Sequence, residues 1–348
     1  MKIAIVGAID SAIKKDALGG TEIWSYSFSN ELTKRGHEVT IFANPESKIE
    51  QKLLSITGAD KIKDPTTGEI SKSLFAYFSI KEMAEVIKNQ DQFDLIHFSV
   101  YSIQYYLPLF ELIKKPIIVT IHGQSLNKSD AEIILPQHKN VGFAIISKSF
   151  LENWPKPVSF QVIYNGINIS DFPFSTAADN YFFWMSRISP EKGVEDAIKF
   201  AEKTGEKLII AGPIRNQKYF DAEIKPKLNS KIKFVGSLGL KEKVAYYQKA
   251  KAFFMPIKWQ EPFGLVTAEA MACGTPVIAY NRGAMAEIIS DKIDGFVIEP
   301  DDIDGLISAA KNLGKIDRKK CREKVERNFT IEKMTDQYLE FYKKVLNI

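Results

Sequence analysis

Residues 20–42 read GTEIWSYSFSNELTKRGHEVTIF. The first part of this stretch has the apolar period of about 3.6 residues that predicts a helix, and the pattern ends at Gly36. The last part is an almost continuous apolar run, which is typical of a parallel strand buried on both faces. A similar run, KIAIV, lies at residues 2–6. The order strand, helix, strand predicts a parallel βαβ unit.

This alternation of apolar runs and helical patterns continues through the chain and occurs as two series. We expect strands at 2–6, 38–42, 94–99, 116–121, 142–146 and 160–164 in the first series, and at 181–185, 207–212, 231–236, 252–256, 275–280 and 294–299 in the second. The predicted fold class is therefore α/β, with two doubly wound Rossmann-like domains. Residues 45–72 are polar, contain no clear strand, and are interpreted as an insertion near a ligand.

A polar segment with turn signals divides the two series. Asn165-Gly166 is a turn dipeptide, and Pro173 lies in a linker-like run. We expect an N-terminal domain at 1–168 and a C-terminal domain at 169–330. The last residues, 331–348, read as an amphipathic helix that packs back on the N-terminal domain. Ligands bind at the carboxyl ends of strands in open α/β sheets, so a cleft between the two domains is the expected site.

Composition excludes several classes of protein. The 348 residues are 45% apolar and 26% charged, as in ordinary globular proteins, and the two cysteines, Cys273 and Cys321, lack metal-ligand spacing. The N-terminus lacks a signal peptide's pattern and no apolar run reaches 18 residues, so a cytoplasmic location is expected. The net charge is +4, and no aromatic-rich basic groove suggests nucleic-acid binding. The basic segment DRKKCREKVERNFT at 317–330 reads as a solvated helix face. Its alternative is a weak contact with anionic lipid at the inner face of a membrane.

A second stretch, EPFGLVTAEAMACGTPVIAY at residues 261–280, places two glutamates eight residues apart. Pro262 favours an extended conformation for Glu261 and also suits the first turn of a helix, which we expect to continue to Cys273. The amides of Phe263, Gly264 and Leu265 would then lie near the start of that helix. Unpaired N–H groups and the helix dipole make such a position suitable for an anion.

Glu269 lies about five residues into this helix, about 7 Å along its axis at 1.5 Å per residue. That length matches the span from a pyrophosphate to the ribose hydroxyls of a nucleotide, and a carboxylate accepts hydrogen bonds from a diol. Glu261 would face a sugar beyond the phosphates. From spacing alone an alternative stays open, in which Glu261 is a surface residue and Glu269 pairs with a neighbouring lysine.

The stretch EPFGLVTAEAMACGTPVIA resembles the E-x₇-E signature of the retaining GT-B glycosyltransferases of glycosyltransferase family 4. Other segments resemble the same family, in its order, over nearly the whole chain: LGGTEIW, VTIHG, VIYNGIN, SRISPEKGVEDAI and KIKFVGSLG. One difference is Asn168, where the family often has aspartate. The resemblance implies a GT-B architecture, with two Rossmann-like domains facing each other across a cleft.

The resemblance also implies roles for individual residues. Arg187 and Lys192 would hold a diphosphate and stabilise the charge of the leaving group, which would make a metal ion unnecessary. His122 would face the reacting centre, and Gly19-Gly20 would let the acceptor or a phosphate approach the backbone. The main chain at Val235 and Gly236 would meet the nucleobase. Asp301 and Asp302 form an Asp-x-Asp pattern, but the helical pattern after them favours helix capping over a metal site.

The sequence therefore predicts a retaining, metal-independent transfer of a hexosyl group from a nucleotide-diphosphate sugar to an acceptor hydroxyl. The expected catalytic residues are His122, Arg187, Lys192 and Glu261, and no cofactor is expected. A UDP-sugar is favoured over GDP-mannose, and the acceptor is a saccharide, a glycolipid or a small molecule. Two alternatives stay open: a nucleotide-sugar epimerase or phosphorylase on the same fold, and a non-catalytic protein that binds sugar nucleotides.

Overall fold

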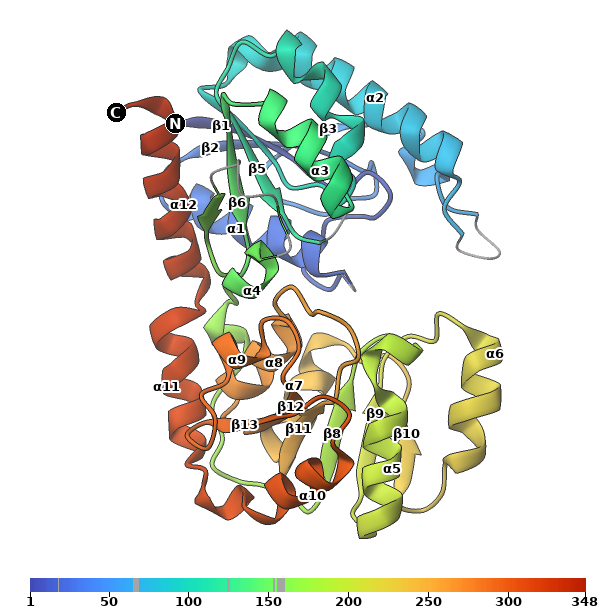
Figure 1. Cartoon of the computed structure of the whole chain (residues 1–348). Coiled ribbons are helices and arrows are strands. Elements are labelled where there is room, and N and C mark those ends of the chain that lie inside the picture. Colours follow the sequence, from blue (N-terminus) through green and yellow to red (C-terminus); the bar gives the residue numbers. More distant parts are fainter. Residues whose placement is uncertain (18, 65–68, 124–125, 153, 155–159) are drawn as a thin grey trace. The chain divides into compact units, whose positions relative to one another are not determined.

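The computed structural model describes residues 1–17, 19–64, 69–123, 126–152, 154 and 160–348. The chain forms two compact units (Figure 1). Unit 1 contains Met1–Gly166 together with Ile331–Ile348, and unit 2 contains Ile167–Thr330. Each unit is a parallel sheet with helices on both faces, and these sheets confirm the predicted doubly wound α/β class.

Unit 1 is built on a sheet of seven parallel strands in the order β3-β2-β1-β4-β5-β6-β7. The strands are β1 (Lys2–Val6), β2 (Glu38–Ala43), β3 (Lys52–Ser55), β4 (Leu95–Phe98), β5 (Ile117–Ile121), β6 (Val141–Ile145) and β7 (Phe160–Val162). The strand order reverses between β1 and β4, which is the position where ligands bind in such sheets.

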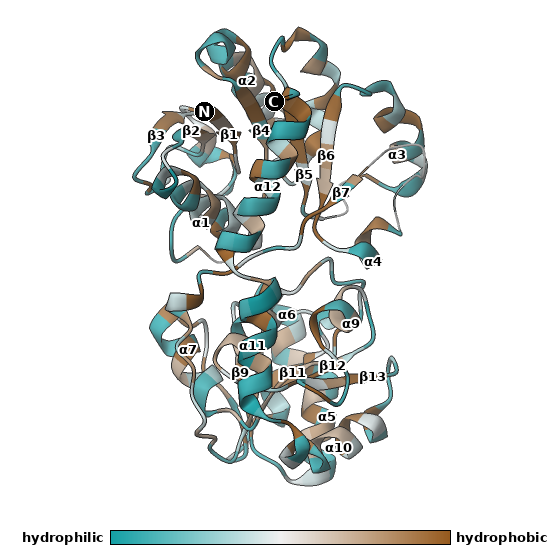
Figure 2. Cartoon of the chain, turned by 90° about the vertical axis from the view of Figure 1, so that its left-hand side faces the viewer, coloured by the Kyte–Doolittle hydropathy of each residue, from teal (hydrophilic) through white to brown (hydrophobic). Residues whose placement is uncertain are grey.

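The described residues of unit 1 form five α-helices: α1 (Gly20–Lys34), α2 (Lys72–Asn89), α3 (Lys128–Ile134), α4 (Lys148–Leu151) and α12 (Ile331–Leu346). Helices α1 and α12 cover one face of the sheet, where Phe28, Tyr338 and Tyr342 pack with Ile3 and Ile5 in one buried cluster. Figure 2 shows that the opposite, outward side of α12 is mainly hydrophilic. The helix is therefore amphipathic, with its apolar side in the core of unit 1.

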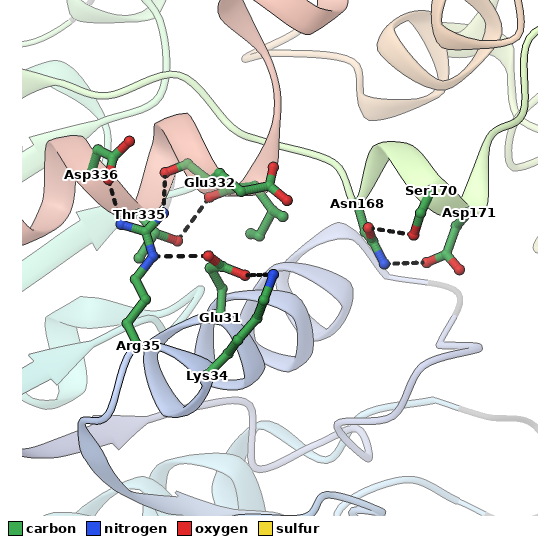
Figure 3. Close-up of polar contacts among 10 residues, drawn as sticks. Glu31, Lys34, Arg35, Asn168, Ser170, Asp171, Glu332, Thr335 and Asp336 are labelled. Atoms are coloured by element: carbon green, nitrogen blue, oxygen red, sulfur yellow. Dashed lines mark hydrogen bonds and ion pairs between the residues drawn. The ribbon is translucent and has the colours of Figure 1, made fainter.

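Arg35, at the end of α1, fixes α12 on this face (Figure 3). Its Nε donates to Glu31 at 2.8 Å, its Nη2 donates to the Glu332 carbonyl oxygen at 2.9 Å, and its Nη1 pairs with Asp336. One guanidinium thus joins its own helix to two turns of the C-terminal helix. Residues far apart in the sequence are held together by a group that offers several donors in one plane.

Unit 2 is built on six parallel strands in the order β10-β9-β8-β11-β12-β13. They are β8 (Phe182–Met185), β9 (Leu208–Ala211), β10 (Ile232–Phe234), β11 (Ala252–Met255), β12 (Val277–Tyr280) and β13 (Gly295–Ile298). The helices are α5 (Val194–Thr204), α6 (Gln217–Tyr219), α7 (Leu240–Lys249), α8 (Leu265–Ala272), α9 (Met285–Ile288), α10 (Ile303–Lys311) and α11 (Arg318–Asn328). Consecutive residues of β8 face opposite helices: Phe182 packs on Phe200 of α5, and Phe183 packs on Tyr247 of α7. The continuous apolar strands are therefore buried on both faces, as their sequences predict.

Two details differ from the sequence-based expectations. The segment 45–72, in which no strand was expected, contains β3, which pairs with β2 at the edge of the sheet; residues 65–68 lie outside the described residues. Only Leu53 and Leu54 are apolar in this strand, because an edge strand is partly exposed. Helix α8 begins at Leu265, so the prediction that Pro262 lies in its first turn is wrong.

Two of the six basic residues of the segment 317–330 bind backbone carbonyls, whereas Lys319, Lys320 and Arg327 are exposed, as expected of a solvated helix face. Arg318 donates to the carbonyl oxygens of Ser175, Gln248 and Ala250 at 2.8–3.0 Å, and Arg322 donates to that of Ala272 at 3.0 Å. These two guanidinium groups therefore satisfy the hydrogen-bonding needs of backbone carbonyl groups inside unit 2. Among the described residues, the structure has no helix with a stretch both long enough and apolar enough to cross a lipid bilayer.

Candidate active site

The carboxyl ends of β8 and β11 meet at the point in unit 2 where the strand order reverses. The segment after β8 carries Arg187 and Lys192, and the segment after β11 carries Glu261. Because parallel strands end at the same edge of a sheet, both segments lie at that edge. Three of the four predicted catalytic residues are thus in unit 2, and the fourth, His122, is in unit 1.

Lys192 and Glu261 form a nearly buried ion pair. The distance from Lys192 Nζ to Glu261 Oε2 is 2.8 Å, and the two side chains are 8% and 12% exposed. Trp259 completes the arrangement, since its Nε1 donates to the same oxygen at 3.0 Å and its ring lies 4.3 Å from Lys192 Nζ. Trp259 is not among the predicted site residues, although an aromatic residue two positions before Glu261 is a signal present in the sequence.

Arg187 has the opposite environment, because half of its side chain is exposed (51%). Its nearest acidic partner is Glu191, at 3.8 Å. Burial opposes ionisation of Glu191, but the Ser189 hydroxyl, a backbone amide and the nearby Arg187 and Lys192 cations together lower the pKa of its carboxyl. Arg187 is therefore a cation at the edge of the sheet with only a loose contact to a carboxylate, as an anion-binding residue requires.

The segments after β8 and β11 are tied together beneath these side chains. Lys258 donates its backbone N–H to the Glu191 carbonyl oxygen at 2.9 Å, and its ammonium contacts buried Asp196 at 3.0 Å. Gly193 adopts φ +72, and a Cβ there would overlap the carbonyl oxygen of Pro256. Only glycine allows this approach of two backbones, which places Lys192 against Glu261.

Gly264 lies between the loop that carries Glu261 and helix α8. It is the N-cap of α8, with φ +89 in the left-handed region, and Leu265 is the first helical residue. Phe263 is 1% exposed and packs edge-on against Phe329, 5.6 Å between ring centroids. The Phe263 side chain therefore belongs to the core. The amides of residues 263–265 lie around the N-terminus of an eight-residue helix, where negative charge is favoured.

Glu269 lies in the second turn of α8 and is 3% exposed. Its Oε1 accepts from Lys243 Nζ at 2.7 Å, and its Oε2 accepts from the Tyr247 hydroxyl at 3.1 Å. Burial, and then the charge of Glu269, raise the pKa of Tyr247 well above its usual value. Each oxygen thus has a partner on α7, and a ribose would have to share the carboxylate with Lys243. Its role in nucleotide binding stays a prediction.

Val235 and Gly236 follow β10 at the same edge of the unit 2 sheet. The Val235 amide donates to the Ile210 carbonyl oxygen at 2.9 Å, and the Gly236 carbonyl oxygen accepts from Gly212 at 2.8 Å. Two of the four main-chain polar groups at these positions therefore belong to the sheet. Recognition of a nucleobase would rely on the other two, the Val235 carbonyl oxygen and the Gly236 amide.

In unit 1, His122 follows β5 and contacts the side chain of Ser99, just after β4, and that of Trp24 in α1. Its Nε2 lies 2.9 Å from the Ser99 hydroxyl, which in turn lies 3.4 Å from the Ser25 hydroxyl, and its ring is 4.9 Å from that of Trp24. Burial lowers the pKa of His122 to about 3. The imidazole is therefore neutral near pH 7, suited to hydrogen bonding and not to charge stabilisation. His97 of β4 lies inside a buried polar network, with its Nδ1 2.6 Å from the Tyr342 hydroxyl.

Gly19 and Gly20 begin α1, Gly19 as its N-cap and Gly20 as its first residue. Leu18, in the same resemblance motif, lies outside the described residues. Glu22 lies in the first turn, so close that a Cβ on Gly19 would overlap its carboxylate. Burial raises the pKa of Glu22. A phosphate at this helix start would therefore meet a carboxyl group.

Within the described residues, the structure has no group of three or more His, Cys, Asp and Glu side chains arranged to hold a metal ion. Asp302 of the Asp-x-Asp pattern caps α10 by accepting from the Gly305 amide at 2.8 Å, as predicted. Asp301 instead pairs with Arg282 at 2.7 Å, so its assignment as a cap is wrong.

Comparison with known protein families matches both halves of the chain. Residues 18–171 match the model described as Glycosyltransferase Family 4, and residues 169–328 match Glycosyl transferases group 1. An uncharacterized glycosyltransferase of Methanocaldococcus jannaschii is 25% identical over 329 residues, covering 83% of each chain. A phosphatidyl-myo-inositol mannosyltransferase of Mycolicibacterium smegmatis is 23% identical over 314 residues, covering 84% of this chain and 81% of that protein.

This chain is a glycosyltransferase of the GT-B type. Among solved structures, it is similar to sucrose-phosphate synthase from Thermosynechococcus elongatus, with a TM-score of 0.80 at 20% identity over 99% of each chain. A second similar structure is Anabaena HepE in complex with UDP and glucose, with a TM-score of 0.76 at 18% identity over 99% of this chain and 100% of that one. At these identities the solved structures establish only the fold, and the assignment as a glycosyltransferase rests on the family matches.

Proposed function

We propose that this glycosyltransferase moves a hexosyl group from a nucleotide-diphosphate sugar to an acceptor hydroxyl, with retention of anomeric configuration and without an essential metal ion. The observation that carries this proposal is the charge pattern after β8 and β11. A half-exposed Arg187 and a buried Lys192 lie at one edge of the sheet, and Glu261 pairs with that lysine. Two cations suit a diphosphate whose negative charge grows as its bond to carbon breaks.

Each of the predicted site residues has a distinct role in the proposed reaction. Arg187 and Lys192 hold the diphosphate, Glu261 turns from Lys192 to hydroxyls of the sugar, and Glu269 contacts the ribose. The acceptor oxygen forms a bond to the anomeric carbon on the face from which the phosphate oxygen departs. The acceptor's proton passes to that departing phosphate. Neutral His122 of unit 1 contributes a hydrogen bond to the sugar, and Gly19-Gly20 admit the acceptor.

A UDP-sugar is the favoured donor. Support comes from the fold neighbour HepE, whose structure contains UDP and glucose. Phosphatidyl-myo-inositol mannosyltransferases among the relatives are the counter-case, because they transfer mannose. The acceptor is a saccharide, a glycolipid or a small molecule bearing a hydroxyl group.

The test is a calorimetric titration of the full chain with UDP, GDP and ADP, followed by transfer assays with the corresponding sugar nucleotides. We expect one diphosphate to bind in the presence of EDTA, and Lys192→Gln and Arg187→Gln to weaken it by about 1.5–3 kcal/mol each. Product analysis by NMR then gives the anomeric configuration. If none of the three nucleotides binds, or if both variants bind as tightly as the natural chain, the donor site is misassigned. An inverted product would refute retention.

A further inference from the structure

Trp259 contacts both charges of the ion pair in unit 2. Its Nε1 donates at 3.0 Å to Glu261 Oε2, the same oxygen that accepts from Lys192 Nζ at 2.8 Å. The centre of the indole ring lies 4.3 Å from the Lys192 ammonium. Both donors therefore approach one carboxylate oxygen. The other oxygen, Oε1, accepts no hydrogen bond within the part of the chain that the structure describes.

The backbone around Trp259 is fixed on both sides. Before it, the Lys258 amide donates to the Glu191 carbonyl oxygen at 2.9 Å, and after it, the Glu261 carbonyl oxygen accepts from the Ala284 amide at 2.9 Å. The indole is partly buried, and its N–H can donate but cannot accept. Trp259 is therefore a donor in a fixed place, whereas the carboxylate beside it has a flexible side chain.

The inference rests on the proposed function, in which the diphosphate takes Lys192 from Glu261. The Glu261 side chain is only 12% exposed, and a carboxylate left there without a partner is costly. Among the described residues, Trp259 is the only other side chain that donates to this carboxylate. The indole N–H can therefore hold Oε2 while Oε1 accepts from hydroxyls of the sugar.

We propose that Trp259 is a positioning residue for sugar transfer and acts through Glu261. Its N–H keeps the carboxylate in place after Lys192 has moved to the diphosphate, so that Oε1 faces the sugar. Without this N–H the carboxylate would have Lys192 as its only protein partner and would compete with the phosphate for the ammonium. Trp259 thereby favours binding of the diphosphate and orients the acceptor of the sugar hydroxyls.

Two single replacements separate the N–H of Trp259 from its ring. W259H keeps an N–H, because Nε2 of histidine occupies the ring position of the indole Nε1, and the imidazole is neutral at pH 8. W259F keeps a large aromatic ring and removes the N–H. The full chain is titrated calorimetrically with UDP, GDP and ADP. We expect W259F to weaken the diphosphate that binds by about tenfold or more, the loss typical of one hydrogen bond to a charged group, and W259H to stay within about threefold.

A double-mutant cycle shows whether Trp259 acts through Glu261. In E261A no carboxylate remains to be held, so adding W259F should change the dissociation constant less than about twofold. Y181F is the matched control, because the Tyr181 hydroxyl donates to the Tyr246 carbonyl oxygen at 2.9 Å just before β8, at the opposite edge of the same sheet. Y181F should bind like the natural chain. Circular dichroism and melting temperatures show that each variant is folded.

Tryptophan fluorescence gives a readout that needs no replacement of Trp259. The other three tryptophans, Trp24, Trp154 and Trp184, are at most 5% exposed. A change in emission when the natural chain binds the diphosphate is therefore expected to come from Trp259, because the ammonium leaves the oxygen that its N–H contacts. An emission spectrum that stays the same at saturating nucleotide would contradict the proposed role.

Three binding results would also overturn the positioning role. These are W259F binding as tightly as the natural chain, W259F binding more tightly than W259H, and an equal effect of W259F with and without the Glu261 carboxylate. The second result would indicate that only the packing of the ring matters, since phenylalanine is the larger replacement. All three leave the proposed function in place, because the natural chain still binds the nucleotide. A natural chain that binds none of the three nucleotides would refute the proposed function, and the role of Trp259 with it.

Discussion

Replacing Glu261 by glutamine should destabilise the free protein and yet tighten the binding of a nucleotide diphosphate. In the structure the Glu261 carboxylate neutralises Lys192 at 2.8 Å, and both side chains are nearly buried. Removing one member of a buried ion pair leaves an uncompensated charge and costs about 3–5 kcal/mol. Glutamine can still accept from Trp259, so we expect the lower end, about 3 kcal/mol.

The same change frees Lys192 for an incoming phosphate. A hydrogen bond between charged partners contributes about 1.5–3 kcal/mol, so UDP should bind at least tenfold more tightly to the Glu261→Gln variant. The rate of sugar transfer should nevertheless fall, because the sugar hydroxyls lose the Glu261 carboxylate as a hydrogen-bond acceptor. Opposite signs in stability and in nucleotide affinity are the distinctive outcome, since a variant that is merely misfolded would lose both.

Differential scanning fluorimetry with and without UDP measures both effects. For a unit of this size about 3 kcal/mol corresponds to a fall of roughly 6–12 °C in the melting temperature of the free protein. Glu323→Gln is the matched control, since that side chain is 44% exposed and lies 3.8 Å from Lys319; it should shift stability by less than about 0.5 kcal/mol. The reasoning is refuted if Glu261→Gln melts like the control, or if it weakens UDP as Lys192→Gln does.

Three further outcomes follow from the geometry. Arg187→Ala should lower kcat by roughly tenfold to 150-fold, about 1.5–3 kcal/mol, because the arginine acts mainly on the leaving group; steady-state kinetics that show a change in KM alone would contradict this. Glu269→Ala should weaken UDP by about 1.5–3 kcal/mol in calorimetry and also destabilise the chain, because Lys243 loses its partner; unchanged UDP affinity would remove Glu269 from the ribose site. Burial lowers the pKa values of His122 and His97 to about 3, so below pH 6.5 the unfolded chain binds more protons than the folded chain. The free energy of unfolding should therefore fall as pH drops from 6.5 towards 3, by up to about 1.4 kcal/mol per pH unit for each histidine. Urea unfolding at pH 7 and 5 would refute this if the His122→Gln variant lost as much stability between the two pH values as the natural chain.

Much of the fold can be predicted from the sequence because parallel strands buried on both faces are almost wholly apolar. All twelve predicted strands are present; nine are one to three residues shorter than predicted, and β2 is one residue longer. The strand that was not predicted, β3, lies at an edge of the sheet and contains only two apolar residues, Leu53 and Leu54, so it has no continuous apolar run. Because proline suits a first turn, the sequence predicts too early a start for α8, whereas Gly264 in the left-handed region determines where the helix begins.

The candidate site was predictable in its residue types and less so in its pairings. Local sequence indicates that Arg187, Lys192 and Glu261 follow strands, but not that the last two neutralise each other, since that contact joins segments 69 residues apart. The partners of Glu269 lie on a different helix, α7, for the same reason. Trp259 is absent from the predicted residues because the sequence shows its position beside Glu261 but not its contact with both charges, which is seen only in the folded chain.

A crystal structure of the chain with an intact UDP-sugar tests the central claim most directly. The account predicts phosphate oxygens within about 3 Å of Lys192 Nζ and of the Arg187 guanidinium. It also predicts that the Glu261 carboxylate leaves Lys192, its partner at 2.8 Å in the free chain, and contacts the sugar hydroxyls. A donor bound elsewhere, with the Lys192–Glu261 pair intact, would contradict it.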